Sequence, residues 1–209
     1  MSELRLNFEN ELSNTACQRG PTPVGISGHD VQFYRTEQYL TRAVVEFLAG
    51  AMRAGQPIIV IATREHRAAF QAGLRSEGLD PDLLFSGRLA VWLDARETLD
   101  AFMEGGRPDR ELFYATVGSV FQMILDKRSY LVVRTFGEMV DVLFKDGNVE
   151  GAIALEKLWN ELGEKYNYSL LCGYSLDNFL HEKGVDAFRN VCGHHTHALP
   201  LESLDQNVA

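Results

Sequence analysis

The sequence lacks the features that mark secreted and membrane-spanning proteins. Its three cysteines, Cys17, Cys172 and Cys192, are an odd number at wide spacing, which argues against a disulfide framework. No apolar run approaches the roughly eighteen residues that span a bilayer. The N-terminal segment is polar and acidic and has no apolar stretch of the kind found in a signal peptide. These absences predict a reduced, cytoplasmic protein that makes no use of a membrane.

A concentrated basic surface is also missing. The chain has 20 Lys and Arg against 29 Asp and Glu, for a formal net charge of -9, and the basic residues are scattered along it. Because nucleic-acid binding usually needs a basic face, this pattern argues against a DNA or RNA partner. The 209 residues, 45% of them hydrophobic and 23% charged, suit one globular domain with a substantial core.

Three motifs of common α/β enzymes do not occur. No Gly-rich segment with Gly-Lys-Ser/Thr follows the first apolar run, where the chain reads YRTEQYLTRA. No GxGxxG follows any predicted strand, and no GxSxG is present. The sequence therefore argues against a standard ATPase, a dinucleotide enzyme and a serine hydrolase, and it predicts no catalytic residue.

Hydrophobic patterning predicts one domain over residues 26–200, with a flexible leader at 1–25 and a flexible tail at 201–209. Within the domain, short apolar runs alternate with amphipathic segments. Strands are expected at 31–34, 57–63, 88–95, 130–137 and 168–175. Helices are expected at 39–52, 64–78, 97–106, 109–127, 148–166 and 184–192. This order predicts an α/β fold with a mostly parallel central sheet and helices on both faces.

In such sheets a ligand binds outside the carboxyl ends of the strands. The residues expected at those ends are Tyr34, Arg35, Thr63, Arg64, Asp94, 134–138 and 174–177. Among them, Glu138 is interpreted either as a ligand or acid–base group or as an ion-pair partner of Arg134. Asp94 is interpreted as a helix cap. His29, just before the first strand, suits a capping role as well as ligand contact.

The segment VCGHHTHALP gathers Cys192, His194, His195 and His197. These are metal-ligand types, but a structural zinc site normally adds a second ligand pair, and none follows the usual spacing. A haem or transition-metal site using Cys192, His195 and His197, with a distant His29 or Glu138, remains an alternative to a segment that closes the domain edge. Cys172, inside an apolar strand, is expected to be an inert core residue.

Several stretches in a fixed order carry a family resemblance. They are HDVQFYRTEQYL, IVIATREHRAAFQAGLRSEGLD, LAVWLDARETLDAFMEGGRPD, RTFGEMVDVLFKDGNVEGAIALEKLWNEL, YSLLCGYSLDNF and VCGHHTHALP. Together they resemble the MEDS domain, the prokaryotic sensory domain named for methanogens, methylotrophs and the regulator DcmR, over residues 27–200. The resemblance implies a RecA- or KaiC-like three-layer sandwich that has lost its phosphate-binding loop.

The resemblance also implies a small-molecule ligand, with hydrocarbon derivatives proposed for the family. Its motifs match here at His29, Phe33, Tyr34, Glu138, Cys172, Tyr174, Cys192, His195 and His197. With Thr63 and Arg134 from the predicted strand ends, these residues form the expected ligand-binding set. No cofactor is expected outside the haem or metal alternative.

Output is expected through a separate signalling protein, such as a histidine kinase or a regulator, because the domain occupies nearly the whole sequence. The leading hypothesis is a non-enzymatic sensor. The alternatives are a metal- or haem-dependent enzyme or sensor that uses the C-terminal histidines, and a ligand-free interaction module. Analogy with RecA-like proteins allows a homodimer.

Overall fold

A six-stranded parallel sheet forms the centre of the molecule. The computed structural model describes residues 22–81, 90–125, 132–181 and 184–199. The sheet contains β1 (Gly28–Tyr34), β2 (Ile58–Ala62), β3 (Ala90–Asp94), β6 (Val133–Gly137), β7 (Tyr168–Ser175) and β8 (His197–Ala198), in the order β3-β2-β6-β7-β1-β8. All neighbouring strands are parallel. The predicted α/β fold with a parallel sheet is confirmed.

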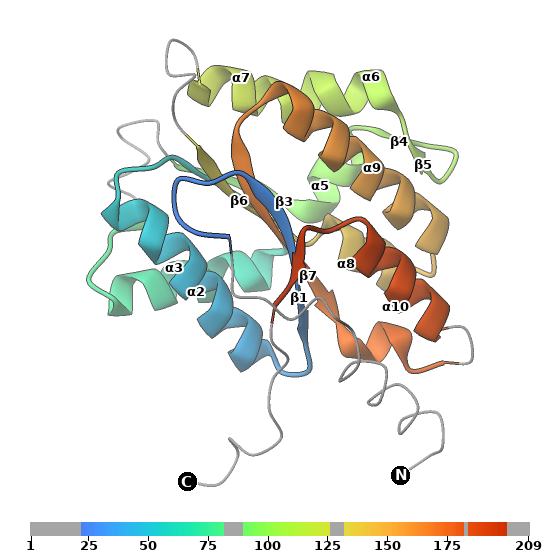
Figure 1. Cartoon of the computed structure of the whole chain (residues 1–209), viewed down its shortest axis with the longest axis horizontal. Helices are drawn as coiled ribbons and strands as arrows, with labels where there is room; N and C mark the ends of the chain where they lie inside the picture. The colour runs from blue at the N-terminus through green and yellow to red at the C-terminus, as the bar shows by residue number, and fades with distance from the viewer. Residues whose placement is uncertain (1–21, 82–89, 126–131, 182–183, 200–209) are drawn as a thin grey trace, which may run out of the picture.

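Helices cover both faces of this sheet (Figure 1). One face carries α2 (Glu37–Arg53) and α3 (Arg64–Ser76). The other face carries α5 (Ala95–Asp100), α6 (Arg110–Phe113), α7 (Ser119–Leu125), α8 (Met139–Lys145), α9 (Val149–Lys165) and α10 (Gly184–Gly193). A π-helical turn, Tyr114–Gly118, joins α6 to α7, and a 3-10 turn, Leu176–Phe179, follows β7.

Side-chain caps set where the helices start. Thr36, Thr63, Asp94, Asp109 and Asn148 each accept a hydrogen bond from a backbone N–H in the first turn of the helix that follows. Such a cap stabilises a helix by about 0.5–2 kcal/mol. The capping role predicted for Asp94 is confirmed.

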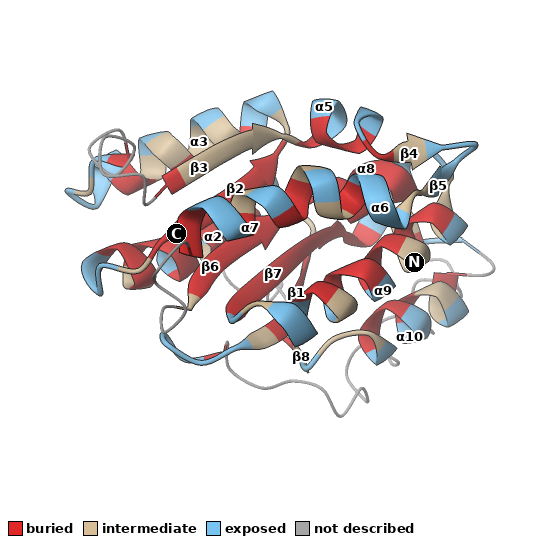
Figure 2. Cartoon of the chain, turned by 90° about the horizontal axis from the view of Figure 1, so that it is seen from above, coloured by how far each residue is buried: buried red, intermediate tan, exposed pale blue. Residues whose placement is uncertain are grey.

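The sheet divides the apolar interior into two layers. The larger layer lies beneath α5 to α10 and includes Trp159, which contacts Phe113, Phe121 and Tyr168 edge to face. The smaller layer lies beneath α2 and α3 and includes Phe70 and Phe136. Figure 2 shows the central strands buried along their length, whereas the edge strand β3 is mostly intermediate.

The structure differs from the sequence prediction in three elements. The helix expected at 97–106 ends at Asp100, and a hairpin of β4 (Met103–Glu104) and β5 (Arg107–Pro108) follows. Gly105 and Gly106 form its turn with φ of 55° and 81°, angles that favour glycine. Helix α8 was not predicted because six of its seven residues are buried and give no amphipathic pattern. Strand β8 has only two residues and pairs with β1.

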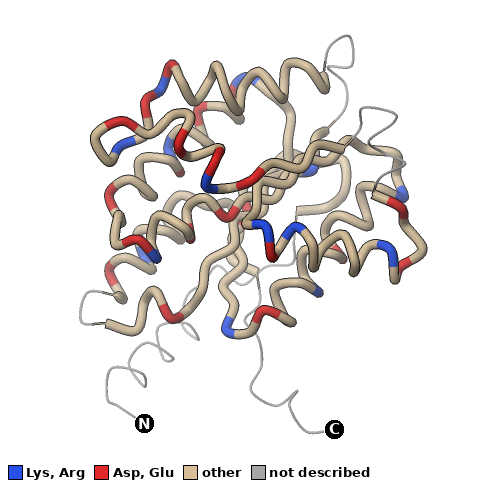
Figure 3. Tube along the Cα trace, turned by 180° about the vertical axis from the view of Figure 1, so that it is seen from behind, with Lys and Arg blue, Asp and Glu red and all other residues tan. Residues whose placement is uncertain are grey.

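The two chain ends extend beyond the described part. The predicted leader and tail fall mostly on residues 1–21 and 200–209, which lie outside it, as do 88–89 and 130–131 of the predicted strands. Within the described part, Thr22 is buried and hydrogen-bonded to Asp30. No described helix is long and apolar enough to cross a bilayer. Figure 3 shows acidic and basic residues interspersed on the outer helices.

Candidate functional site

Four metal-ligand side chains meet in the larger layer of the interior. We call His29, Glu156, Cys172 and His195 the buried centre. One ligand-type atom from each lies within 4.8 Å of all the others. His29 Nε2 is 3.3 Å from Cys172 Sγ and 3.2 Å from Glu156 Oε2. His195 Nε2 is 3.5 Å from Glu156 Oε1, and Cys172 Sγ is 3.8 Å from Glu156 Oε2.

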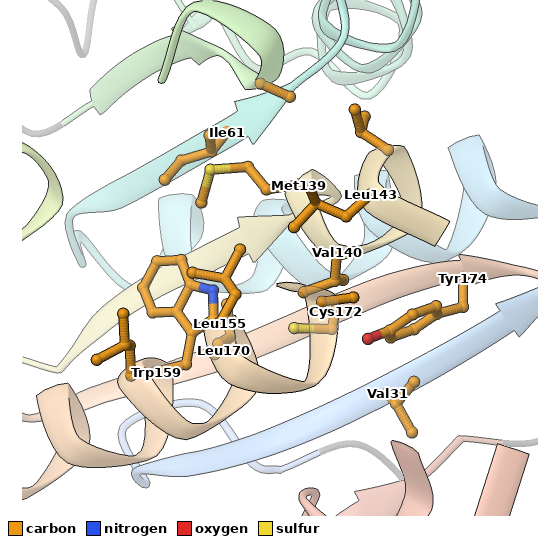
Figure 4. Close-up of a cluster of buried hydrophobic side chains, with 14 of the residues drawn as sticks. Val31, Ile61, Met139, Val140, Leu143, Leu155, Trp159, Leu170, Cys172 and Tyr174 are labelled. Carbon is orange, nitrogen blue, oxygen red and sulfur yellow. The ribbon is translucent and has the colours of Figure 1, made fainter. Parts of the chain in front are cut away.

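The four side chains come from different parts of the chain. His29 is the second residue of β1, and Cys172 lies in the middle of the neighbouring strand β7. Glu156 projects from α9, and His195 follows α10. Figure 4 shows Cys172 among apolar side chains between β7 and α9. The centre is therefore set within the body of the sheet and away from its carboxyl edge.

Hydrogen bonds around the centre define the tautomer of both histidines. His195 Nδ1 lies 2.7 Å from the carbonyl oxygen of Val191, which can only accept, so Nδ1 carries a proton. Asn160 donates through Nδ2 to the carbonyl of His194, so its Oδ1 faces His29 Nδ1 at 2.9 Å and accepts from it. In the neutral rings both Nε2 atoms are then unprotonated, and both point toward the carboxylate of Glu156.

This arrangement places several acceptors against one another. Tyr174 donates its hydroxyl proton to Glu156 Oε1 at 2.6 Å, whereas a neutral histidine offers the carboxylate only a lone pair. His195 Nε2 is buried and has no hydrogen-bond partner in the described chain. Buried polar atoms without partners are rare and costly. With neutral histidine rings, the buried centre therefore has more hydrogen-bond acceptors than donors and no positive charge beside Glu156.

Burial governs the protonation of these groups. It lowers the pKa of His195 to about 4, against the opposing charge of Glu156, so this ring is neutral at neutral pH. Burial also raises the pKa of the Cys172 thiol and of the Tyr174 hydroxyl well above their usual values. For Glu156, burial raises the pKa, but positive charge on His195 and His29, with hydrogen bonds from His29 and Tyr174, outweighs burial and holds the pKa below its usual value. Neutral rings remove most of that effect, so an ionised Glu156 in this apolar layer needs a positive charge beside it.

A second polar cluster lies at the carboxyl ends of β2 and β6. Glu138, which begins α8, accepts hydrogen bonds from the Thr63 backbone N–H and from His66 Nδ1. The other ring nitrogen of His66 contacts Glu37, at the start of α2. Thr63 caps α3 through its hydroxyl. Of the two interpretations of Glu138, the ion pair with Arg134 is not formed, because Glu138 pairs with His66.

Asp141 extends this cluster to the ends of β1 and β7. Its carboxylate accepts from the Ser175 backbone N–H at 2.8 Å, from Asn178 Nδ2 at 2.6 Å and from the Tyr34 hydroxyl at 3.1 Å. Lys145 Nζ lies 2.8 Å from the same carboxylate. We call Tyr34, His66, Glu138 and Asp141 the strand-end network. Hydrogen bonds among its polar groups connect the carboxyl ends of β1, β2, β6 and β7.

The strand-end network predicts a pH dependence of stability. Burial lowers the pKa of His66, but Glu138 and Glu37 outweigh it and raise the pKa to about 9. The pKa of His66 is higher in the folded protein than in the unfolded chain. The stabilisation of the fold by protonated His66 is therefore complete below about pH 6.5 and is lost as pH rises through about 9. We expect a loss of about 1–2 kcal/mol between these limits, after allowing for screening at the exposed Glu37.

Urea unfolding of wild type and His66→Gln between pH 6 and 10 tests this prediction. The variant should be less stable at pH 6 and should show a flatter profile. His181→Gln, at an exposed histidine, is the control and should retain the wild-type slope. Parallel profiles for wild type and His66→Gln would contradict the assignment.

A cleft of about 380 Å³ lies beside α2, on the face of the sheet opposite to the buried centre. We call it the α2 cleft. Its apolar walls include Val24, Ala43, Phe47 and Leu199, and its polar groups include Gln32 and Arg134. Its full lining is Thr22, Pro23, Val24, Gln32, Tyr39, Arg42, Ala43, Glu46, Phe47, Gly50, Arg134 and Leu199.

Arg134 is the charged group at the buried end of this cleft. Its guanidinium donates to the carbonyl of Thr22 at 2.9 Å and to Ser169 Oγ at 3.2 Å, and it lies 3.9 Å from the centre of the Phe47 ring. Its hydrogen-bond partners within the described chain are neutral oxygens. Burial lowers the pKa of Arg134 to about 10, which still leaves it cationic at neutral pH.

The structure separates the expected ligand-binding residues into several groups. His29, Cys172, Tyr174 and His195 come together at the buried centre. Tyr34, Thr63 and Glu138 meet in and around the strand-end network, and Arg134 lines the α2 cleft.

Three expected residues lie apart from these groups. Phe33 packs against Phe188 and Tyr174 in the core, and Cys192 is buried in the same layer. His197 contacts Asp30 at 3.0 Å. Among the described residues, the group that could hold a metal contains His195 and His29 but neither Cys192 nor His197.

Glu156 is the residue that sequence reasoning missed. It belongs to the buried face of α9 with Ala152 and Trp159, at helical spacing. A carboxylate on the apolar face of an amphipathic helix is a signal that could have identified it, because ionised groups are seldom buried without partners. Asn160, one turn further on, shares that side of the helix and reaches His29.

A parallel sheet in the order β3-β2-β6-β7-β1-β8, covered by helices on both faces, defines a RecA-like α/β sandwich. Its two-residue β1–α2 connection, Arg35 and Thr36, contains no glycine. The family model described as "MEDS: MEthanogen/methylotroph, DcmR Sensory domain" matches residues 28–195. The chain belongs to the MEDS family of sensory domains.

A solved structure supports the fold assignment. The KaiC-like protein PH0186 from the hyperthermophilic archaeon Pyrococcus horikoshii OT3 is similar to this chain with a TM-score of 0.51 and 16% identity. The similarity covers 79% of this chain and 70% of that protein. At this identity the likeness concerns the fold alone. The comparison with curated proteins found no match.

Proposed function

We propose that this protein is a non-enzymatic, cytoplasmic sensor that binds a small hydrocarbon derivative in the α2 cleft and signals to a separate protein. The observation that carries the proposal is the combination in one cleft of apolar walls with a buried cation, Arg134, whose hydrogen-bond partners are neutral oxygens. Its volume of about 380 Å³ is in the range of small-molecule sites, which usually pair an apolar lining with a few polar groups.

The side chains of the cleft indicate the chemistry of the ligand. An apolar body fits between Ala43, Phe47 and Leu199. An electronegative group, such as an oxygen or a halogen, fits near the Arg134 guanidinium, which is held in place by backbone carbonyls. Among the hydrocarbon derivatives that the resemblance to the MEDS family implies, this preference favours halogenated or oxygenated ones.

The cleft also suggests a route for the signal. Helix α2 supplies half of the lining, and its first residue, Glu37, contacts His66 of α3. A ligand that favours one position of α2 would shift the balance of two states by its difference in affinity for them. Output then passes to a partner such as a histidine kinase or a regulator.

Ligand binding can be tested by thermal unfolding with a panel of haloalkanes, short alcohols and short-chain carboxylates. A ligand at 100 times its Kd stabilises the folded protein by about 2.7 kcal/mol, which is roughly 5–10 °C for a domain of this size. Ala43→Leu should abolish the shift because the larger side chain occupies the cleft while preserving helix propensity.

The matched control is Ala69→Leu, at a partly exposed alanine of α3 outside the cleft lining. It should retain the shift. If no compound in the panel raises the melting temperature, or if Ala43→Leu responds like wild type, the α2 cleft is not the input site.

A further inference from the structure

The buried centre has the composition and spacing of a metal site. We propose that His29 Nε2, Glu156, Cys172 Sγ and His195 Nε2 bind one divalent transition-metal ion of the zinc class in four-coordinate geometry. The site lies on the opposite face of the sheet from the α2 cleft, so the proposal is independent of the proposed function.

The distances between the four side chains support this assignment. A tetrahedral ion with bonds of about 2.0–2.3 Å holds its ligand atoms about 3.3–3.8 Å apart. The separations of 3.3 Å (His29 Nε2 to Cys172 Sγ), 3.2 Å (His29 Nε2 to Glu156 Oε2) and 3.8 Å (Cys172 Sγ to Glu156 Oε2) fall close to this range. His195 Nε2 lies 3.5 Å from the other carboxylate oxygen, Oε1, and one ligand atom from each of the four residues lies within 4.8 Å of the others. An organic molecule has no room between atoms this close, whereas a single ion does.

Hydrogen bonds outside the four ligands are those that metal-binding histidines require. A ligating histidine typically donates its second ring N–H to a carbonyl or carboxylate, which orients the ring toward the ion. His195 does this to the Val191 carbonyl, and His29 to the Asn160 side chain. Tyr174 similarly holds Glu156. Both inward-facing Nε2 atoms therefore present lone pairs.

One buried acceptor without a hydrogen-bond partner is a second observation that favours a cation at the centre. His195 Nε2 is buried and has no hydrogen bond within the described residues, and it lies 3.5 Å from Glu156 Oε1. An ion at the centre would accept its lone pair and that of His29, and would neutralise the buried carboxylate. This explains why an acidic group is placed on the apolar face of α9.

Ligand chemistry selects the class of ion. Imidazole, thiolate and carboxylate together suit Zn²⁺, Co²⁺ and related ions, whereas Mg²⁺ and Ca²⁺ prefer oxygen ligands. On binding, the Cys172 S–H bond is replaced by a sulfur–metal bond, and the proton leaves to solvent. A set of four protein ligands is typical of structural rather than catalytic sites, which keep a position open.

The ion has a route to the centre. A pocket of about 220 Å³ opens beside His29 and Asn160. It is lined by Ser27, Gly28, His29, Asn160, Gly163 and Tyr168. Because the ligands come from β1, β7, α9 and the segment after α10, a bound ion would join the C-terminal closing segment to the sheet.

Cobalt binding tests the proposal directly. The full-length protein is stripped with chelator under reducing conditions and titrated with Co²⁺, then with Zn²⁺ in competition. We expect one equivalent to bind, with intense visible bands of four-coordinate Co²⁺ and a near-ultraviolet thiolate-to-cobalt band, all removed by Zn²⁺. Cys172→Ser should lose the thiolate band and weaken Co²⁺ binding about 100-fold or more, and Asn160→Ala should weaken it about 10-fold.

The matched control is Cys192→Ser, at a buried cysteine in the same layer that is outside the centre. It should retain the spectrum and the affinity of wild type. Circular dichroism establishes that each variant is folded, and Cys172→Ala replaces Cys172→Ser if the latter is not. Absence of stoichiometric Co²⁺ binding in wild type, or a thiolate band that persists without Cys172, would overturn the proposal.

Discussion

Replacing Glu156 with glutamine is expected to stabilise the metal-free protein and to remove most of its stabilisation by metal. With neutral histidine rings in the metal-free centre, the carboxylate of Glu156 lies 3.2 Å from the lone pair of His29 Nε2. A glutamine amide nitrogen at that position would donate to His29, while its oxygen would still accept from Tyr174. The substitution removes a buried charge and repairs one acceptor–acceptor contact, so it should raise the free energy of unfolding by about 1–3 kcal/mol.

Zn²⁺ should stabilise the wild type and have little effect on Glu156→Gln. Wild type at 100 times the Kd for Zn²⁺ should gain about 2.7 kcal/mol, which is roughly 5–10 °C in melting temperature. Glu156→Gln lacks the charged ligand and should gain little. Two-state urea unfolding in chelator and in buffered Zn²⁺ measures both effects.

Glu161→Gln is the control for this experiment, because Glu161 lies on the same helix but is partly exposed and pairs with Arg110. It should change stability by less than about 1 kcal/mol in either buffer. If the centre is instead a network of protonated histidines around a carboxylate, Glu156→Gln should destabilise the protein in both buffers. That result, with no response of wild type to Zn²⁺, would reject the metal site.

Removing the Asp141 side chain is expected to cause the largest loss of stability. Asp141→Ala would leave the Ser175 N–H, the Tyr34 hydroxyl and the Asn178 amide without their acceptor at the carboxyl edge of the sheet. Unsatisfied buried donors cost about 1–3 kcal/mol each. We expect a loss of about 3–5 kcal/mol in total, in line with other broken buried charge networks.

Thermal and urea unfolding of Asp141→Ala, Asp141→Asn and Asp146→Ala measure this effect. The asparagine variant keeps one acceptor and should lose less than the alanine variant. Asp146 forms an exposed pair with Arg96, so its replacement should cost less than about 1 kcal/mol. Equal, small losses for all three variants would show that the strand-end network contributes little to the fold.

The periodic elements were predictable from sequence because their signals are local. The continuous apolar runs at β2 and β7 and the amphipathic pattern of α2 and α9 correctly indicated strands covered on both faces and helices packed on them. Helix α8 could not be predicted from the sequence because almost all of its residues are buried, so it lacks the polar face by which an amphipathic helix is recognised. The hairpin after α5 could not be predicted because each of its strands has only two residues, too few to show an alternating pattern.

The candidate sites were predictable only in part. The polar chemistry of His29, Cys172 and His195 could be recognised in the sequence, and the resemblance to the MEDS family gathered them into one set. Their separation from Glu138, Arg134 and His197 depends on which face of the sheet each side chain takes, and that follows from strand order and register. Alternate residues of a strand point to opposite faces, so His29 and Asp30 belong to different clusters.

The sequence by itself determined the class of fold, the absence of the standard Gly-Lys-Ser/Thr motif and the family, because each depends on patterns within short stretches of the chain. Only the tertiary structure decided that Glu156 joins His29, Cys172 and His195. Those four residues are brought together by the pairing of β1 with β7 and by the packing of α9 and α10 over them. Such contacts between distant segments follow from burial of the shared apolar layer, which no local pattern specifies.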